Sequence, residues 1–144
     1  MNRLRDYDAE RDYATIRDWW LANGMDAPPA YVLPPTGAVI ENEAGRLMAA
    51  SFVYLNNSAM AYVAFTSCDP TMSPRETFHS AEVAMKAAIE IGRRHVGARG
   101  VIWTCSHLPS MHRMAVKRCG FTDTGPAATG QIQIGGEFST DCMS

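Results

Sequence analysis

Residues 60–94 read MAYVAFTSCDPTMSPRETFHSAEVAMKAAIEIGRR, and the fold of the chain depends on this stretch. Its first part, residues 60–67, is apolar on both faces, which is typical of a strand in the middle of a sheet. Ser73 then precedes Pro74, and Glu76 follows three residues after Ser73, which is a capping box with proline at the first helical position. The alanine-rich segment behind it repeats apolar residues at helical spacing. The stretch therefore predicts a central strand joined to a long helix that packs closely on the sheet.

The chain before this stretch predicts a short strand, a helix and two further strands. Residues 4–7 favour the strand, and an amphipathic helix follows from Asp8 until Asn23 and Gly24 cap its end. Four prolines within residues 28–35 exclude regular structure there. Short turns then predict an antiparallel meander of three strands, over residues 37–41, 47–55 and 60–67.

The chain after the long helix predicts a second strand–helix unit. Residues 101–104 indicate a short buried strand, so replacing Trp103 by alanine is expected to cost about 3–5 kcal/mol. Pro109 and Ser110 open a helix that reaches Cys119 and that Gly120 ends. The last strands are predicted over residues 121–124 and 131–134.

Length and composition favour one globular domain over residues 1–134, followed by a loose tail over residues 135–144. The 144 residues are 47% hydrophobic and 19% charged, which allows a sizeable core and excludes wholesale disorder. The chain has neither an apolar run of about 20 residues nor an apolar leader, so we expect a cytoplasmic protein without membrane partners. The scattered cysteines and histidines have no metal-ligand spacing, which predicts free thiols and no metal site.

Charge is unevenly distributed along the chain. The net charge is −2, but residues 72–121 hold eight Lys or Arg and three Glu, which gives this segment +5. A ligand that carries phosphates would prefer this half of the protein. The same pattern also fits a solvated basic helix face.

The order of the predicted elements, β–α–β–β–β–α–β–α–β–β, resembles the GNAT superfamily of acyl-CoA-dependent N-acyltransferases over about residues 4–134. The ending Val116-Lys117-Arg118-Cys119-Gly120-Phe121 looks like the family's Y-x-K-x-G-F, with valine in place of tyrosine. The resemblance implies a single α+β domain with a mixed, mostly antiparallel sheet flanked by helices. It also implies acetyl-CoA as co-substrate.

The resemblance implies two binding regions for acetyl-CoA. The end of the central strand, at Phe65, Thr66 and Ser67, would hold the pantetheine arm and polarise the thioester carbonyl through its backbone. The start of the long helix would meet the pyrophosphate through its N–H groups and positive dipole end. The side chains that would assist there are Arg75, Thr77 and His79.

The sequence departs from the family pattern at both the phosphate loop and the catalytic acid. The loop over residues 72–77 has no glycine, and its Pro74 and Glu76 remove a donor and add a negative charge. Val116 stands where many family members have a catalytic tyrosine, and valine cannot donate a proton. Ser106 and His107, at the end of the strand over residues 101–104, are therefore the candidate catalytic residues, with Asp69 as another possible base.

Three functions remain open on the sequence. The first is an acyltransferase that acts on an amine of a small molecule or a protein. The second is a non-enzymatic interaction or virion-associated protein on a degenerate GNAT scaffold, of the kind found in phages. The third is a GNAT-like enzyme that modifies nucleic-acid bases, which the basic segment favours and the overall acidity opposes.

Overall fold

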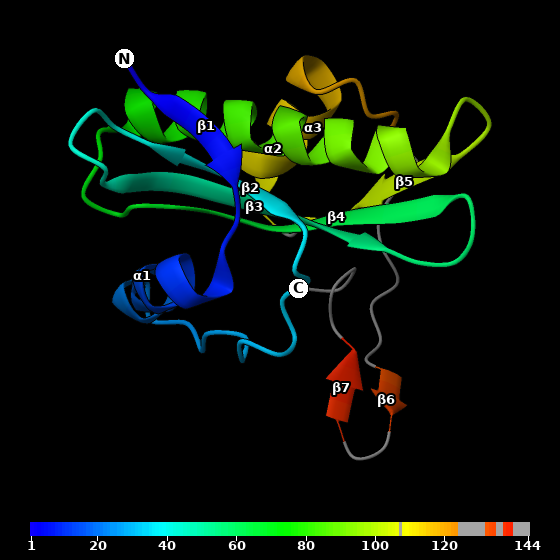
Figure 1. Cartoon of the computed structure of the whole chain (residues 1–144), viewed down its shortest axis with the longest axis horizontal. Coiled ribbons are helices and arrows are strands. Elements are labelled where there is room, and N and C mark those ends of the chain that lie inside the picture. Colours follow the sequence, from blue (N-terminus) through cyan, green and yellow to red (C-terminus); the bar gives the residue numbers. More distant parts are fainter. Residues whose placement is uncertain (107, 124–131, 135–136, 140–144) are drawn as a thin grey trace.

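The computed structural model describes residues 1–106, 108–123, 132–134 and 137–139. Its main sheet has five strands in the order β1–β2–β3–β4–β5 (Figure 1). The first four pair antiparallel with their neighbours, whereas β5 lies parallel to β4. The sheet is therefore mixed and mostly antiparallel, as predicted. The strand bounds are β1 (Arg3–Asp6), β2 (Gly37–Glu41), β3 (Leu47–Leu55), β4 (Met60–Cys68) and β5 (Val101–Thr104).

Helices cover both faces of the sheet (Figure 1). On one face, Ile16 of α1 joins a buried cluster with Phe52 of β3. On the other face, Met85 of α2 and Met114 of α3 belong to a second buried cluster. This three-layer arrangement confirms the predicted α+β fold with helices flanking the sheet. The helix bounds are α1 (Ala9–Ala22), α2 (Pro74–Val96) and α3 (Pro109–Arg118).

Small residues let α2 lie close to the sheet, as the sequence predicts. Ala81, Ala88 and Gly92 of this helix are buried. A Cβ atom at Gly92 would lie 3.3 Å from Val53 Cγ2 and 3.4 Å from Ala61 Cβ, so this turn of the helix almost touches β3 and β4. The close approach fixes α2 along the strand whose far end forms the candidate site.

The capping box at the start of α2 is present as predicted. The Glu76 N–H donates to Ser73 Oγ at 3.3 Å, and the Ser73 N–H donates to Glu76 Oε2 at 3.0 Å. Replacing Ser73 by alanine is therefore expected to lower the free energy of unfolding by about 1 kcal/mol, because the Glu76 N–H loses its acceptor. Urea unfolding followed by circular dichroism measures this change. An unchanged midpoint would mean that the cap contributes nothing, and Ser110→Ala, outside any described cap, is the matched control.

The strand β5 departs from the sequence expectation. It lies at the edge of the five-stranded sheet, and its Trp103 and Val101 are 46% and 50% exposed. The expected strand is present, but the expectation that it is buried is wrong. A loss of about 3–5 kcal/mol for Trp103→Ala, which assumes complete burial, therefore does not apply to this side chain.

Of the two last strands predicted, one is confirmed and the other is not. Residues 121–123 are not in a strand, and residue 124 lies outside the described residues. The final strands are β6 (Ile132–Ile134) and β7 (Glu137–Ser139), which pair antiparallel as a separate two-stranded sheet. The order of element types is thus as predicted. The strand expected over residues 131–134 corresponds to β6, whereas β7 lies within residues 135–144, where a loose tail was expected. A helix able to span a membrane is not found in the described part of the chain.

Candidate functional site

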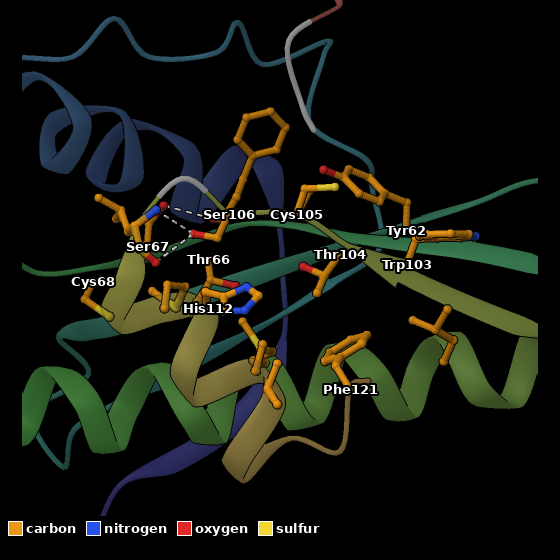
Figure 2. A pocket seen from close by; sticks show the side chains of 18 of the residues that line it. Tyr62, Thr66, Ser67, Cys68, Trp103, Thr104, Cys105, Ser106, His112 and Phe121 are labelled. Carbon is orange, nitrogen blue, oxygen red and sulfur yellow. Dashed lines mark hydrogen bonds between the residues drawn. The ribbon is translucent and has the colours of Figure 1, made fainter. Parts of the chain in front are cut away.

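The candidate site lies where β4 and β5 separate. The two strands pair from Met60 with Val101 to Val63 with Thr104, and β4 then continues alone on that side to Cys68. The Thr104 hydroxyl donates to the Val63 carbonyl at 2.9 Å, at the last point of contact. Beyond Thr104 the chain leaves the sheet toward α3, whereas β4 continues. A space therefore opens between β4 and the chain that follows β5 (Figure 2).

A cavity of about 1370 Å³ occupies this divergence. Its walls come from α1, β4, α2, β5, α3 and the segment that follows α3. Ligand cavities in proteins are commonly about 300–1,000 Å³. The space is therefore large enough for an extended ligand arm and a second small molecule beside it.

A β-bulge shapes the β4 wall of the cavity. Ala50 of β3 pairs with Ser67 and Phe52 pairs with Ala64, so β4 has one more residue than β3 over this interval. The backbone of Phe65 takes a φ of +55°, in the left-handed region that is costly for a residue with a bulky side chain. Strained backbone of this kind concentrates at functional sites. Only surrounding contacts can hold it.

Those contacts come largely from α1. The Trp20 ring lies 5.8 Å from the Phe65 ring, edge to face, and the Tyr54 ring lies 6.4 Å from it. Trp20 Nε1 donates to Ser67 Oγ at 3.0 Å, and Ser67 Oγ donates to the Phe65 carbonyl at 2.9 Å. On the opposite face of β4, the Thr66 and Ser51 hydroxyls share a hydrogen bond of 2.8 Å. The bulge is thus fixed from both faces of the sheet.

The predicted site residues fall into three groups. Ser106 lines the cavity, together with four of the predicted acetyl-CoA contacts, namely Phe65, Thr66, Ser67 and Thr77. Arg75 and His79 do not line the cavity and are exposed on the first turns of α2. His107 lies outside the described residues.

Ser106 supports the chain before α3. Its Oγ accepts a hydrogen bond from the Leu108 N–H at 3.1 Å, and Leu108 is the N-cap residue of that helix. The hydroxyl therefore satisfies a backbone donor at the helix start. This contact gives Ser106 a structural role at the rim of the cavity.

The start of α2 satisfies most of its own donors. The Ser73 and Glu76 N–H groups are used in the capping box, and Pro74 has no N–H. The backbone hydrogen bond from Ser73 holds the pKa of Glu76 below its ordinary value, so the carboxylate is charged at neutral pH. A glycine-rich phosphate loop offers free N–H groups at this position. Here the capping box does not use the backbone N–H of Arg75, which stays available in the first turn. The Arg75 side chain is exposed at the same place.

Fixed negative charge lines the cavity. Asp69 and Asp123 are among the lining residues, whereas no lysine or arginine is found in the described lining. Burial alone would raise the pKa of Asp69, but hydrogen bonds from Thr71 and Arg46 bring that pKa below its ordinary value. Asp69 is therefore a charged, paired carboxylate, and the expectation that it can serve as a base near neutral pH finds no support in this geometry.

Two further groups in the cavity bear on its chemistry. Burial raises the pKa of the Cys68 thiol to about 12, and its Sγ lies 3.6 Å from the Thr77 carbonyl, so this cysteine is not a nucleophile at neutral pH. Among the described residues, no cluster of His, Cys, Asp and Glu could hold a metal ion. Acid–base chemistry in this cavity therefore needs another side chain.

Sequence reasoning missed a histidine–carboxylate pair in the cavity. His112 of α3 and Asp123 both line it, and His112 Nε2 lies 3.3 Å from Asp123 Oδ2. The sequence holds one signal of this placement, because His112 lies four residues before Val116. Residues four apart lie on the same face of a helix. The helix face that carries Val116 therefore also carries the imidazole of His112.

Comparisons with known proteins identify the fold. Neither a protein-family profile nor a curated protein sequence matches this chain. Several solved acetyltransferase structures have the same fold, and all share little sequence with the chain. A probable acetyltransferase from methicillin-resistant Staphylococcus aureus is similar with a TM-score of 0.65 and 13% identity, over 93% of this chain and 98% of that one.

Two eukaryotic enzymes are similar as well. A Trypanosoma brucei acetyltransferase has a TM-score of 0.59 and 13% identity, over 93% of this chain and 99% of that one. Glucosamine-6-phosphate N-acetyltransferase from Arabidopsis thaliana has a TM-score of 0.57 and 12% identity, over 96% and 99%. The chain therefore has the GNAT fold over nearly its whole length. Identities this low establish the fold alone.

Proposed function

We propose that this chain is an acyl-CoA-dependent N-acyltransferase, which moves an acetyl or related acyl group from acetyl-CoA to an amine of a small molecule or a protein. The observation that carries the proposal is the cavity between the diverging strands, with the strained bulge at Phe65 in its wall. A backbone conformation that costs free energy and is fixed by contacts on both faces is typical of a site that has to present backbone groups in one geometry.

The bulged strand supplies the backbone groups that the reaction needs. Because β4 has no β5 partner beyond Val63, the polar backbone groups on that edge face the cavity and can hold an extended pantetheine arm, as an added strand would be held. An N–H group beside the thioester carbonyl would stabilise the charge that develops on its oxygen. One bond forms, between the acceptor nitrogen and the carbonyl carbon, and the carbon–sulfur bond breaks. The products are an amide and free CoA thiol.

The charge of the cavity favours a cationic acceptor. Asp69, directly after β4, and Asp123, after α3, give the cavity lining negative charge that would attract an ammonium group. The absence of lysine and arginine from the described lining leaves nothing there to hold the phosphates of a nucleic-acid strand. This observation weighs against a base-modifying enzyme and supports a small-molecule or protein amine.

The start of α2 supports a second candidate function. Its capping box uses the N–H groups that a pyrophosphate would need, and Glu76 adds a repelling charge. A GNAT scaffold that no longer binds acyl-CoA, and that serves as an interaction or virion-associated protein, would have no reason to retain those donors. The two functions differ in one measurable property, which is affinity for acetyl-CoA.

Calorimetric titration with acetyl-CoA therefore tests the proposal. We expect Arg75→Ala to weaken binding about 10–100-fold and Arg75→Glu to weaken it further, because a charge-assisted contact with phosphate is lost. Glu76→Gln keeps a capping side chain and removes a negative charge, so its affinity should rise modestly. Arg99→Ala, at the other end of α2, removes the same charge far from this turn and serves as the control.

Each outcome of the titration decides between the two functions. Opposite effects of Arg75→Glu and Glu76→Gln on the affinity support binding at the start of α2, because unfolding would weaken binding in both variants. No binding by the wild-type protein at millimolar acetyl-CoA would reject the transferase and leave the non-enzymatic scaffold. An affinity that Arg75→Glu leaves unchanged would place the phosphates elsewhere.

A further inference from the structure

We propose that His112 is the general base of the acyl transfer and that Asp123 positions it; this inference rests on the function proposed above. The two side chains meet at the rim of the cavity, where they are 45% and 54% exposed, with His112 Nε2 3.3 Å from Asp123 Oδ2. Figure 2 draws the His112 ring among the side chains that line the cavity. A histidine held by a carboxylate through one ring nitrogen keeps its other ring nitrogen for a substrate, and this arrangement is suited to proton transfer.

The position of His112 on α3 explains how it reaches the reacting groups. Val116 follows one helical turn later, and both side chains line the cavity. Valine at that place can neither accept nor donate a proton. His112 brings an ionisable group to the same face of α3. The helix therefore carries an acid or base one turn before Val116.

The other ionisable side chains around the cavity are less suited to this task. Asp69, at the end of β4, is held by Arg46 and Thr71. Cys68 of β4 is partly buried, with its Sγ 3.6 Å from the Thr77 carbonyl oxygen. Between α2 and α3, Glu82 and Arg118 are paired with each other at 2.6 Å. Cys105 follows β5 in the lining, and an ordinary thiol is mostly protonated near neutral pH, so it offers little free base there.

The proton transfer can be written so that every proton is accounted for. Nε2–H of His112 donates to Asp123, which leaves the lone pair on Nδ1, and no described hydrogen bond engages that atom. Nδ1 takes a proton from the bound ammonium group, and the neutral amine attacks the thioester carbonyl carbon. As the carbon–sulfur bond breaks, the second proton of the nitrogen passes to the departing sulfur. The proton on His112 returns to water.

The test uses the full-length protein with acetyl-CoA and three probe amines, which are spermidine, glucosamine and phenethylamine. We expect His112→Gln to lower kcat for the best of these amines by about 10²–10⁴-fold, because general base catalysis contributes about this much. The dissociation constant of acetyl-CoA, measured by calorimetry, should stay within about twofold. Added imidazole should restore part of the activity of His112→Ala, which a purely structural role would not allow.

The split between kcat and KM separates positioning from folding effects. Asp123→Asn should lower kcat while KM for the amine changes by less than about twofold, because the imidazole loses the contact that orients it. His95→Gln is the control, because His95 binds the Asn56 carbonyl at 2.7 Å near the far end of α2 and does not line the cavity. Circular dichroism of each variant checks that it is folded.

The outcomes distinguish this proposal from the function on which it rests. If the wild-type protein acetylates an amine and His112→Gln is equally active, His112 is not the base, although the transferase stands. A kcat that falls equally in His112→Gln and His95→Gln, or that imidazole does not restore, also overturns the role of His112. A wild-type protein that binds no acetyl-CoA, or transfers to none of the amines, overturns both proposals.

Discussion

Replacing Arg5 by methionine is expected to lower the free energy of unfolding by about 3–5 kcal/mol, because it leaves the buried carboxylate of Asp12 without its charged partner. The guanidinium donates to both oxygens of Asp12, at 2.7 and 2.9 Å, and that side chain is 1% exposed. Its Nε also donates to Glu41 at 2.9 Å. One side chain of β1 thereby binds α1 and β2 together. Urea unfolding measures the loss.

Two comparisons sharpen this expectation. Arg17→Met removes an exposed arginine whose partner is the neighbouring Asp18, so it should change stability by less than about 1 kcal/mol. Arg5→Lys should recover part of the loss, because an ammonium cannot make the same forked contact. Equal losses for Arg5→Met and Arg17→Met would contradict the role of the buried pair.

The contact between Arg5 and Glu41 has a defined pH dependence. The hydrogen bond from Arg5 holds the pKa of Glu41 below its ordinary 4.5, and Arg3 adds to this effect. A carboxylate with a lowered pKa stabilises the fold above its unfolded pKa, and this contribution is lost as the pH falls through the folded pKa. The stability difference between wild type and Arg5→Met should therefore be largest above pH 4.5 and narrow below it.

The second large effect is expected for Phe52→Ala, which should destabilise the protein by about 3–5 kcal/mol. Phe52 is completely buried on the α1 face of the sheet, and its ring meets the Tyr7 ring edge to face at 4.7 Å. Removing it deletes apolar surface and leaves a cavity whose walls, the sheet and α1, are tied by other contacts. The denaturation midpoint measures the loss.

Phe78→Ala is the matched control for this variant. The Phe78 side chain on α2 is 44% exposed, so the same chemical change there should cost less than about 1 kcal/mol. Similar losses at the two positions would mean that Phe52 is not in the core. That result would contradict the packing of α1 on this face of the sheet.

Much of the fold could be predicted because its signals are local. The capping box at Ser73 and Glu76 lies within four residues, and the meander follows from short turns between apolar runs. The exposure of Trp103 could not be predicted in the same way, because it depends on the strand order, which places β5 at the sheet edge. A short apolar segment looks the same at an edge and in the centre.

The candidate site was predictable only in part. Thr66 and Ser67 lie in the cavity wall as the resemblance implies, but the bulge carries a left-handed Phe65 where a glycine would have signalled it. His112 and Asp123 are eleven residues apart and meet because the chain reverses at Gly120, whose φ is +87°. No short motif joins two such residues.

The contacts that α1 makes with the bulge of β4 also help to set the shape of the cavity. Trp20 packs on Phe65 and hydrogen-bonds Ser67, so the left-handed backbone loses its support on one face of the sheet when this turn of α1 undocks. Proteins open locally, in cooperative segments, at free energies below that of global unfolding. If α1 detached while the sheet stayed intact, Phe65 would relax and the edge of β4 would lose its arrangement. Heat or denaturant would then abolish ligand binding before the sheet melts.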